Sequence, residues 1–152
     1  MTQPFKKIKV NAIKHGTVID HIAAGKVLKV IEILEINGQN AVMMGMNLNS
    51  SKIGKKDIIK IENRELSVEE ANSIALISPN ATLIIIKDFE VVKKVELHIP
   101  EQIEKHIICP NPKCITNEEN IISRFNINSK TGNVRCAYCE KKYKLEKLKI
   151  KI

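Results

Sequence analysis

The chain has 152 residues, of which 43% are hydrophobic and 28% are charged, and this composition predicts a globular protein of one or two domains. No apolar run approaches the roughly 18 residues of a membrane span, so we expect a soluble protein. The net charge of +8 is compatible with nucleic-acid binding, but residues 1–99 hold 14 Lys and Arg against 11 Asp and Glu, so only residues 100–152 are clearly basic.

The first predicted elements are a strand and a helix joined by a short link. Apolar and polar residues alternate over residues 6–13, which is the period of a strand with one buried face. Residues 16–22, GTVIDHI, are predicted to be the link. From Ala23 to Asn37 the apolar residues recur at helical spacing. The predicted buried face of this helix consists of Val27, Leu28, Ile31 and Leu34.

Four strands and a second helix complete the N-terminal part. Residues 41–48 and 57–63 have strand composition and flank the polar turn NSSKIGKK. Ser67 and Glu70 match a capping box, and Pro79 ends the helix. Its predicted buried face consists of Ala71, Ile74, Ala75 and Ser78. Two more strands follow at 81–87 and 91–99, giving β-α-β-β-α-β plus one strand, the order of a ferredoxin-like α+β sandwich.

Pro100 marks the predicted boundary between a domain of residues 1–99 and a smaller, β-rich domain of residues 100–152. In the last stretch, KKYKLEKLKIKI, lysine alternates with apolar residues, which is typical of a half-buried strand. The sequence contains no internal repeat.

The four cysteines all lie in the second domain, in CPNPKC and CAYC; they are Cys109, Cys114, Cys136 and Cys139. Two disulfides, a redox pair and one tetrahedral metal site are the competing interpretations. The N-terminal sequence lacks the apolar region and cleavage site of a secretory signal, so we expect a cytoplasmic protein whose thiols stay reduced. A redox pair would use CAYC alone and leave Cys109 and Cys114 unexplained. The spacing favours one Zn²⁺ bound by all four thiolates.

The predicted zinc is structural, because four thiolates fill the tetrahedron and leave no position for an activated water. A metalloenzyme would need an open zinc position or a separate catalytic centre. The three aspartates and four histidines form no recognisable acid-base pair, and the chain has neither a phosphate-binding loop nor a nucleophile elbow. No catalytic residue is therefore predicted.

Asp20 and His21 are adjacent in the predicted link. In the simpler interpretation Asp20 caps the following helix and His21 is exposed. In the functional interpretation both hydrogen-bond a ligand, and Lys56 and Lys60 supply charge for phosphate groups. The residues alone leave both interpretations open.

The segments AIKHGTVIDHI, GKKDIIKIEN, DFEVVKK, ICPNPKC and CAYCEK resemble, in this order and spacing, the regulatory chains of aspartate carbamoyltransferase, over about residues 10–143. The resemblance implies a non-catalytic subunit that controls the first committed step of pyrimidine biosynthesis. It implies that residues 1–99 bind nucleotide effectors such as CTP and ATP, and that residues 100–152 dock on the catalytic chain. It also implies a regulatory-chain homodimer formed through the N-terminal sheets.

Matched position by position, the family's nucleotide site falls on Ala12, Ile13, Asp20, His21, Lys56, Lys60, Val91 and Lys94. The resemblance implies that the backbone at the first two positions reads the base edge, that the lysines meet phosphate or ribose oxygens, and that Val91 is an apolar wall. Asp20 would accept a hydrogen bond from a ribose hydroxyl.

Three positions depart from the family pattern. Asn11 stands where the family has glutamate, Ile84 where asparagine is common, and Phe89 where it has tyrosine. The apolar side chains of Ile84 and Phe89 remove hydrogen bonds to the base or sugar, each worth about 0.5–1.5 kcal/mol. We therefore expect altered affinity or an altered preference between CTP and ATP.

The alternative hypothesis is a zinc-ribbon nucleic-acid-binding protein, supported by the pI of 9.3 and the cysteine quartet. The five aromatic residues are too few and too scattered for a base-stacking surface. The partners that the resemblance implies are the catalytic chain, a second regulatory chain and nucleotides, and we expect no nucleic acid and no membrane as partners.

Overall fold

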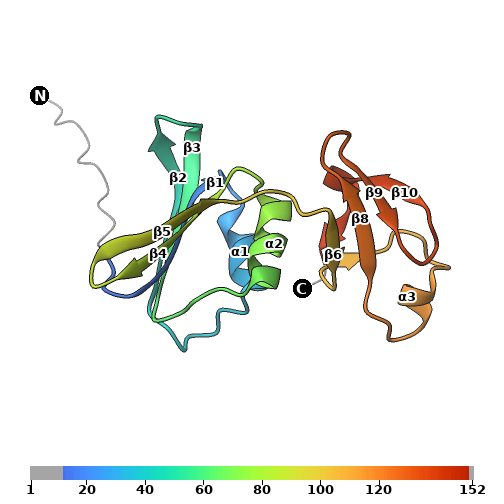
Figure 1. Ribbon diagram of the computed structural model, residues 1–152, viewed down its shortest axis with the longest axis horizontal. Helices are drawn as coiled ribbons and strands as arrows, with labels where there is room; N and C mark the ends of the chain where they lie inside the picture. Colours follow the sequence, from blue (N-terminus) through green and yellow to red (C-terminus); the bar gives the residue numbers. More distant parts are fainter. Residues whose placement is uncertain (1–11, 151–152) are drawn as a thin grey trace, which may run out of the picture.

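The computed structural model describes residues 12–150 and consists of two units, each built on its own antiparallel sheet (Figure 1). The elements of the N-terminal unit are β1 Gly16–Ala23, α1 Val27–Ile33, β2 Val42–Ser50, β3 Gly54–Glu62, α2 Val68–Ile77, β4 Thr82–Lys87 and β5 Glu90–Glu96. Its five strands are ordered β2-β3-β1-β4-β5, and every neighbouring pair is antiparallel.

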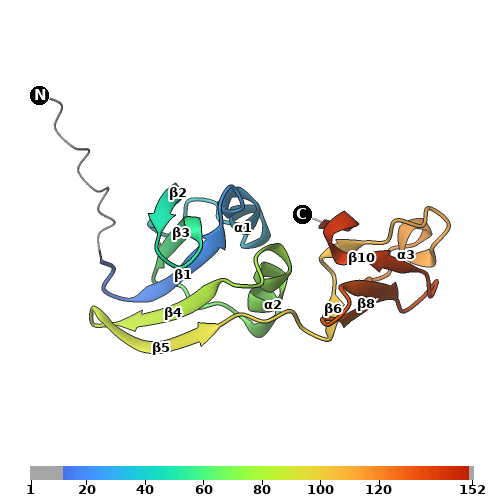
Figure 2. The ribbon, with the colours of Figure 1, turned by 90° about the horizontal axis from the view of Figure 1, so that it is seen from above.

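The first four strands and two helices confirm the predicted ferredoxin-like sandwich. Strands β1 and β3 occupy the middle of the sheet, and β5 is added beyond β4. Both helices cover one face of this sheet and lie between it and the C-terminal unit (Figures 1 and 2). Apolar side chains from β1 and β3 pack with α1 and α2 in one buried cluster that includes Ile19, Ile59, Val30 and Ile74.

The prediction that residues 16–22 form a link is wrong, because this segment is the central strand β1. The strand lies between β3 and β4, and its first four residues, Gly16, Thr17, Val18 and Ile19, are all buried. Because residues directed to both faces are buried, the alternation of polar and apolar residues that marks a half-exposed strand is missing. The strand predicted at 6–13 lies mostly outside the described residues, and Ala12 and Ile13 belong to no strand.

The first helix is shorter than predicted and buries a different face. Its buried residues are Val27, Val30 and Ile33, whereas Leu28 is 50% exposed. The predicted face of Val27, Leu28, Ile31 and Leu34 is thus wrong in part, because a helix of seven residues offers too few turns to distinguish two apolar stripes by periodicity.

The second helix begins as predicted. The Ser67 hydroxyl accepts a hydrogen bond from the Glu70 amide at 3.1 Å, and the Glu70 carboxylate accepts one from the Ser67 amide at 3.1 Å. Ile74, Ala75 and Ser78 of the predicted face are buried. The turn between β2 and β3 is shorter than the predicted NSSKIGKK, because both strands extend into it and leave only residues 51–53.

The C-terminal unit is a small β structure around a second buried cluster. Its elements are β6 Gln102–Glu104, β7 Ile107–Ile108, α3 Ile115–Glu118, β8 Arg124–Asn128, β9 Asn133–Cys136, β10 Lys142–Lys144, the 3₁₀ helix η1 Leu145–Lys147 and β11 Lys149–Ile150. They form a four-stranded sheet, β10-β9-β8-β6, and a two-stranded sheet, β11-β7. The single strand predicted at 141–152 is wrong, since η1 divides its described part into β10 and β11.

The two units meet at a narrow seam. Leu76 of α2 and Ile99 of the connecting segment pack against the C-terminal cluster, which includes the fully buried Phe125. Within residues 12–150, none of the helices combines the length and the apolar content needed to cross a bilayer.

Candidate functional site

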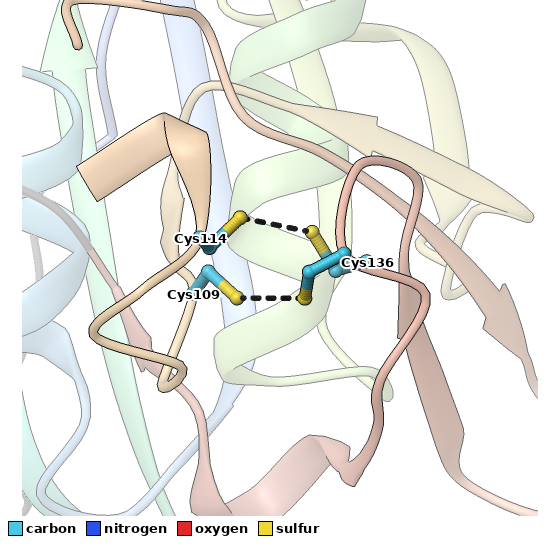
Figure 3. Close-up of side chains that lie close together, drawn as sticks. Cys109, Cys114 and Cys136 are labelled. Carbon is cyan, nitrogen blue, oxygen red and sulfur yellow. Dashed lines mark hydrogen bonds between the residues drawn. The ribbon is translucent and has the colours of Figure 1, made fainter. Parts of the chain in front are cut away.

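Two turns bring the four cysteines together in the C-terminal unit. Cys109 follows β7 and Cys114 precedes α3, while Cys136 ends β9 and Cys139 lies in the turn before β10. The Sγ atoms of Cys109 and Cys139 are 3.6 Å apart, those of Cys114 and Cys136 are 3.7 Å apart, and all four lie within 4.8 Å of one another (Figure 3). None of the four forms a disulfide.

These distances fit a tetrahedral metal site. Thiolates bound to Zn²⁺ at about 2.3 Å lie about 3.8 Å apart along the edges of the tetrahedron. A disulfide would bring two sulfurs to about 2.05 Å. Three of the cysteines are buried and the fourth is half-buried, so the set has the closed character of a structural site.

Polar groups around the cluster fix its two turns. The Asn117 amide donates to the carbonyl of Cys109 at 2.8 Å and to the carbonyl of Asn111 at 2.7 Å. The Thr116 hydroxyl lies 3.1 Å from the sulfur of Cys114. On the other side, the Cys136 amide donates to the Lys141 carbonyl at 3.1 Å, which closes the turn that carries Cys139. Such outer groups hold metal ligands in a fixed orientation.

The crowding of four sulfurs makes their protonation unequal. Burial raises the pKa of the Cys109 thiol to about 12 and raises that of Cys136. Burial acts in the same sense on Cys139, but the backbone of Lys141 and the side chain of Asn111 lower its pKa to about 7. A bound cation is what allows four neighbouring thiols to lose their protons together.

The second candidate site lies on the face of the N-terminal sheet opposite the helices. Asp20 and His21 form a β-bulge in β1, where the pairing with β3 shifts between Ile19 and Ile22. His21 has a positive φ of 54°, its amide donates to Asp20 Oδ1 at 2.7 Å, and its Nδ1 lies 3.1 Å from the Thr82 hydroxyl. The bulge therefore directs the His21 ring toward Thr82 and holds the Asp20 carboxylate against the His21 amide.

Asp20 is paired with a lysine. Its Oδ1 lies 2.8 Å from Nζ of Lys56, and each side chain is only about one-fifth exposed, at 18% and 20%. Burial would raise the pKa of Asp20, but the hydrogen bonds from Lys56 and the His21 amide hold it below its ordinary value. Asp20 is thus a carboxylate at neutral pH, and predicted positions 20, 21 and 56 are in direct contact.

The remaining predicted residues are placed by strand register. Lys60 of β3 pairs with Val18 of β1, Val18 with Ile84 of β4, and Ile84 with Lys94 of β5. Directly paired residues share one face of a sheet, so Lys60 and Lys94 lie on the face that carries Asp20, three strand spacings or about 14 Å apart. Val91 pairs with Ile86, two residues along β4, and is 59% exposed.

Ala12 and Ile13 begin the described chain, and Ala12 is exposed. The adjoining Lys14 carbonyl accepts a hydrogen bond from the Phe89 amide at 3.0 Å, so this segment runs beside the β4–β5 turn. The outer residues of the predicted site therefore share a face with the bulge or lie at the edge of that face beside the β4–β5 turn.

Sequence reasoning missed two groups beside this face. Thr82 pairs with Asp20 and contacts His21. Lys52, in the β2–β3 turn, forms a 3.3 Å ion pair with Glu96 at the end of β5. Only the strand order could have revealed either, since the segments are far apart in the chain.

Known families match both units. The model described as "Aspartate carbamoyltransferase regulatory chain, allosteric domain" matches residues 8–98, and that described as "Aspartate carbamoyltransferase regulatory chain, metal binding domain" matches residues 101–149.

Several curated proteins resemble the chain over nearly its whole length, each named aspartate carbamoyltransferase regulatory chain. The protein from Pyrococcus abyssi is 51% identical over 147 residues, covering 93% of this chain and 96% of its own. The protein from Methanococcus maripaludis is 51% identical over 137 residues, covering 90% and 93%. The protein from Methanocaldococcus jannaschii is 48% identical over 139 residues, covering 91% and 93%.

Proposed function

Since this chain belongs to the family of aspartate carbamoyltransferase regulatory chains and is a non-catalytic subunit with an allosteric and a metal-binding domain, we propose that it binds nucleotides on one unit and the catalytic chain on the other. The observation that carries the proposal is that the two family matches fall on different units, each with its own antiparallel sheet and its own buried cluster. We divide the chain at Pro100, into residues 1–99 and 100–152.

The proposed effector site is the sheet face that carries Asp20, His21, Lys56, Lys60 and Lys94. Its support is chemical: a nucleotide offers phosphate oxygens for ammonium groups and ribose hydroxyls for a carboxylate. The Lys56–Asp20 pair supplies both, and the bulge brings the His21 amide to Asp20 and the His21 ring to Thr82. We propose CTP and ATP as the ligands, with Val91 and the backbone of Ala12 and Ile13 against the base.

Selectivity is expected to differ from the family pattern at two described positions. Ile84 lies between Lys94 and Val18 in the row across the sheet, so an apolar side chain faces the proposed ligand there. Phe89 is 63% exposed in the β4–β5 turn and offers no hydroxyl. Both changes remove hydrogen bonds to base or sugar without removing the phosphate-binding lysines, so the location of the site is retained.

We propose that the cysteine cluster binds one Zn²⁺ and that the folded C-terminal unit is the platform for the catalytic chain. The sulfur distances and the all-thiolate ligand set support zinc, which favours four tetrahedral sulfur ligands in structural sites. The platform then depends on the metal, because few apolar side chains are buried around the cysteines. A cytoplasmic location is proposed as well, because its reducing conditions keep thiols available for the metal.

We further propose that two regulatory chains pair through their N-terminal sheets. The edge strand β2 supports this, since Met43, Met44 and Met46 are 39%, 46% and 42% exposed. An apolar edge strand is suited to pairing with a second sheet, and a symmetric pair leaves both C-terminal units free to bind catalytic chains.

Light scattering of the zinc-loaded chain mixed with aspartate carbamoyltransferase catalytic trimers tests the proposal. We expect a large complex that a chelator dissolves and that added Zn²⁺ restores. Aspartate saturation curves of the complex, with and without CTP or ATP, then test regulation. No complex in either condition would refute the proposal. Salt-sensitive binding to RNA or duplex DNA, unaffected by CTP, would instead favour the nucleic-acid hypothesis.

A further inference from the structure

Asp57 is a fully buried carboxylate in the middle of β3, and the proposed site does not use it. Its exposed fraction is 0%. Its Oδ2 accepts hydrogen bonds from the backbone amides of Gly25 at 2.8 Å and Val27 at 3.1 Å, and its Oδ1 accepts one from the amide of Asn47 at 2.8 Å. A buried charge needs such compensation, and here every donor is backbone from another segment.

The three hydrogen bonds join β3 to the start of α1 and to an irregular point in β2. The residue at the helix N-cap, Lys26, makes no side-chain cap, so Asp57 acts in its place. Asn47 has a positive φ of 56° and lies where the pairing of β2 with β3 shifts. Asp57 therefore fixes two segments that have no regular pairing of their own at these positions.

The residue before Asp57 belongs to the proposed effector site. Lys56 forms the 2.8 Å ion pair with Asp20 on the outer face, whereas Asp57 points toward the helix layer. Consecutive residues of a strand face opposite sides of a sheet. A shift of β3 that follows a change in the Lys56–Asp20 pair would thus reach the start of α1 through a single residue.

The first turn of α1, which Asp57 holds, reaches the seam between the two units. Lys26 and Lys29 line a cavity of about 500 Å³ together with Leu76 of α2 and with Leu145 and Leu148 of the C-terminal unit. The start of α1 is therefore one wall of the seam, and both views show the helices between the sheet and the C-terminal unit (Figures 1 and 2).

We propose that Asp57 is a positioning residue that couples the effector face to the seam between the units. It contacts no ligand; it holds the first turn of α1 in register with β3, so that occupancy of the outer face changes the seam. The inference rests on the proposed nucleotide regulation and adds the route by which the signal crosses the sheet and the helix layer.

The test is Asp57→Asn in the assembled holoenzyme. The amide nitrogen cannot accept a hydrogen bond, so either the Asn47 amide or the Gly25 and Val27 amides lose their acceptor. We expect the dissociation constant for CTP to stay within about twofold of the wild type, since the outer face is intact. The ratio of half-saturating aspartate concentrations with and without CTP should move to near 1. The matched control is Glu65→Gln, which removes one negative charge from an exposed loop and should leave this ratio unchanged.

Hydrogen exchange of the wild-type holoenzyme provides a test that does not depend on a variant that folds. Saturating CTP should change the exchange rates of the Gly25, Val27 and Asn47 amides. An unchanged aspartate ratio in Asp57→Asn would overturn the role of Asp57, as would CTP binding that leaves all three amides unaltered. A wild-type holoenzyme that does not bind CTP would instead refute the proposed function, and the coupling role with it.

Discussion

Replacing one cysteine should unfold the C-terminal unit and leave the N-terminal unit folded. In Cys136→Ser a fully buried thiol becomes a hydroxyl, which is a poor zinc ligand, in a cluster whose sulfurs already lie at tetrahedral spacing. Structural zinc contributes about 10–16 kcal/mol in small zinc domains, whereas a whole domain is typically stable by about 5–15 kcal/mol. The free energy lost with tight zinc binding is therefore as large as the whole unfolding free energy of a typical domain, and the C-terminal unit is expected to unfold.

The assay combines zinc content, hydrogen exchange and light scattering with catalytic trimers. We expect Cys136→Ser to bind zinc weakly, to lose amide protection in β8 and β9, and to form no complex, while β1 and β3 stay protected. The matched control is Ala137→Ser, which places a hydroxyl on the neighbouring exposed residue of the same turn and should behave as wild type. A Cys136→Ser chain that retains protected β8 amides and assembles would refute the metal-dependent platform.

Three further outcomes follow from the contacts of the N-terminal unit. Lys60→Ala and Lys94→Ala should each weaken CTP binding by calorimetry and leave assembly intact; unchanged isotherms would remove these lysines from the site. The pKa of Asp20 is lowered in the folded state, so its stabilising effect relative to Asp20→Asn should be constant above about pH 5 and disappear as the pH falls below 3.8. Urea midpoints of both chains across pH 3–7 measure this, and a difference independent of pH would contradict it. Ser67→Ala removes the capping-box acceptor and should cost about 1 kcal/mol of unfolding free energy, with Ser51→Ala in an exposed turn as the neutral control.

Local sequence signals predicted the elements whose causes are local. The capping box at Ser67 and Glu70 lies within one helical turn, and the paired cysteines lie within two turns, so spacing alone indicated both. The central strand β1 was mistaken for a link because burial on both faces removes the alternation on which strand prediction depends. The bulge at Asp20 and His21 could not be predicted, since it exists only relative to the register of β3.

The role of Asp57 shows the same limit more sharply. In the sequence it is one of three aspartates and begins a predicted strand, with nothing to separate it from a solvated residue. Its hydrogen-bond donors, Gly25, Val27 and Asn47, precede it in the chain by 32, 30 and 10 residues. Only the packing of β3 beneath α1 gives the carboxylate those partners, so its importance depends entirely on tertiary structure.

The arrangement of the two units constrains how any signal can pass between them. The proposed effector face and the cysteine cluster lie on opposite sides of the helix layer, and each unit has its own core. The described apolar contacts between the cores are few, with Leu76 and Ile99 packing against the C-terminal cluster. A small seam of this kind favours relative motion over a rigid joint. Both units contact the layer of α1 and α2, so a movement of these helices would change the seam. Of the two, α1 is connected to β3, the strand that carries Lys56, through the buried carboxylate of Asp57.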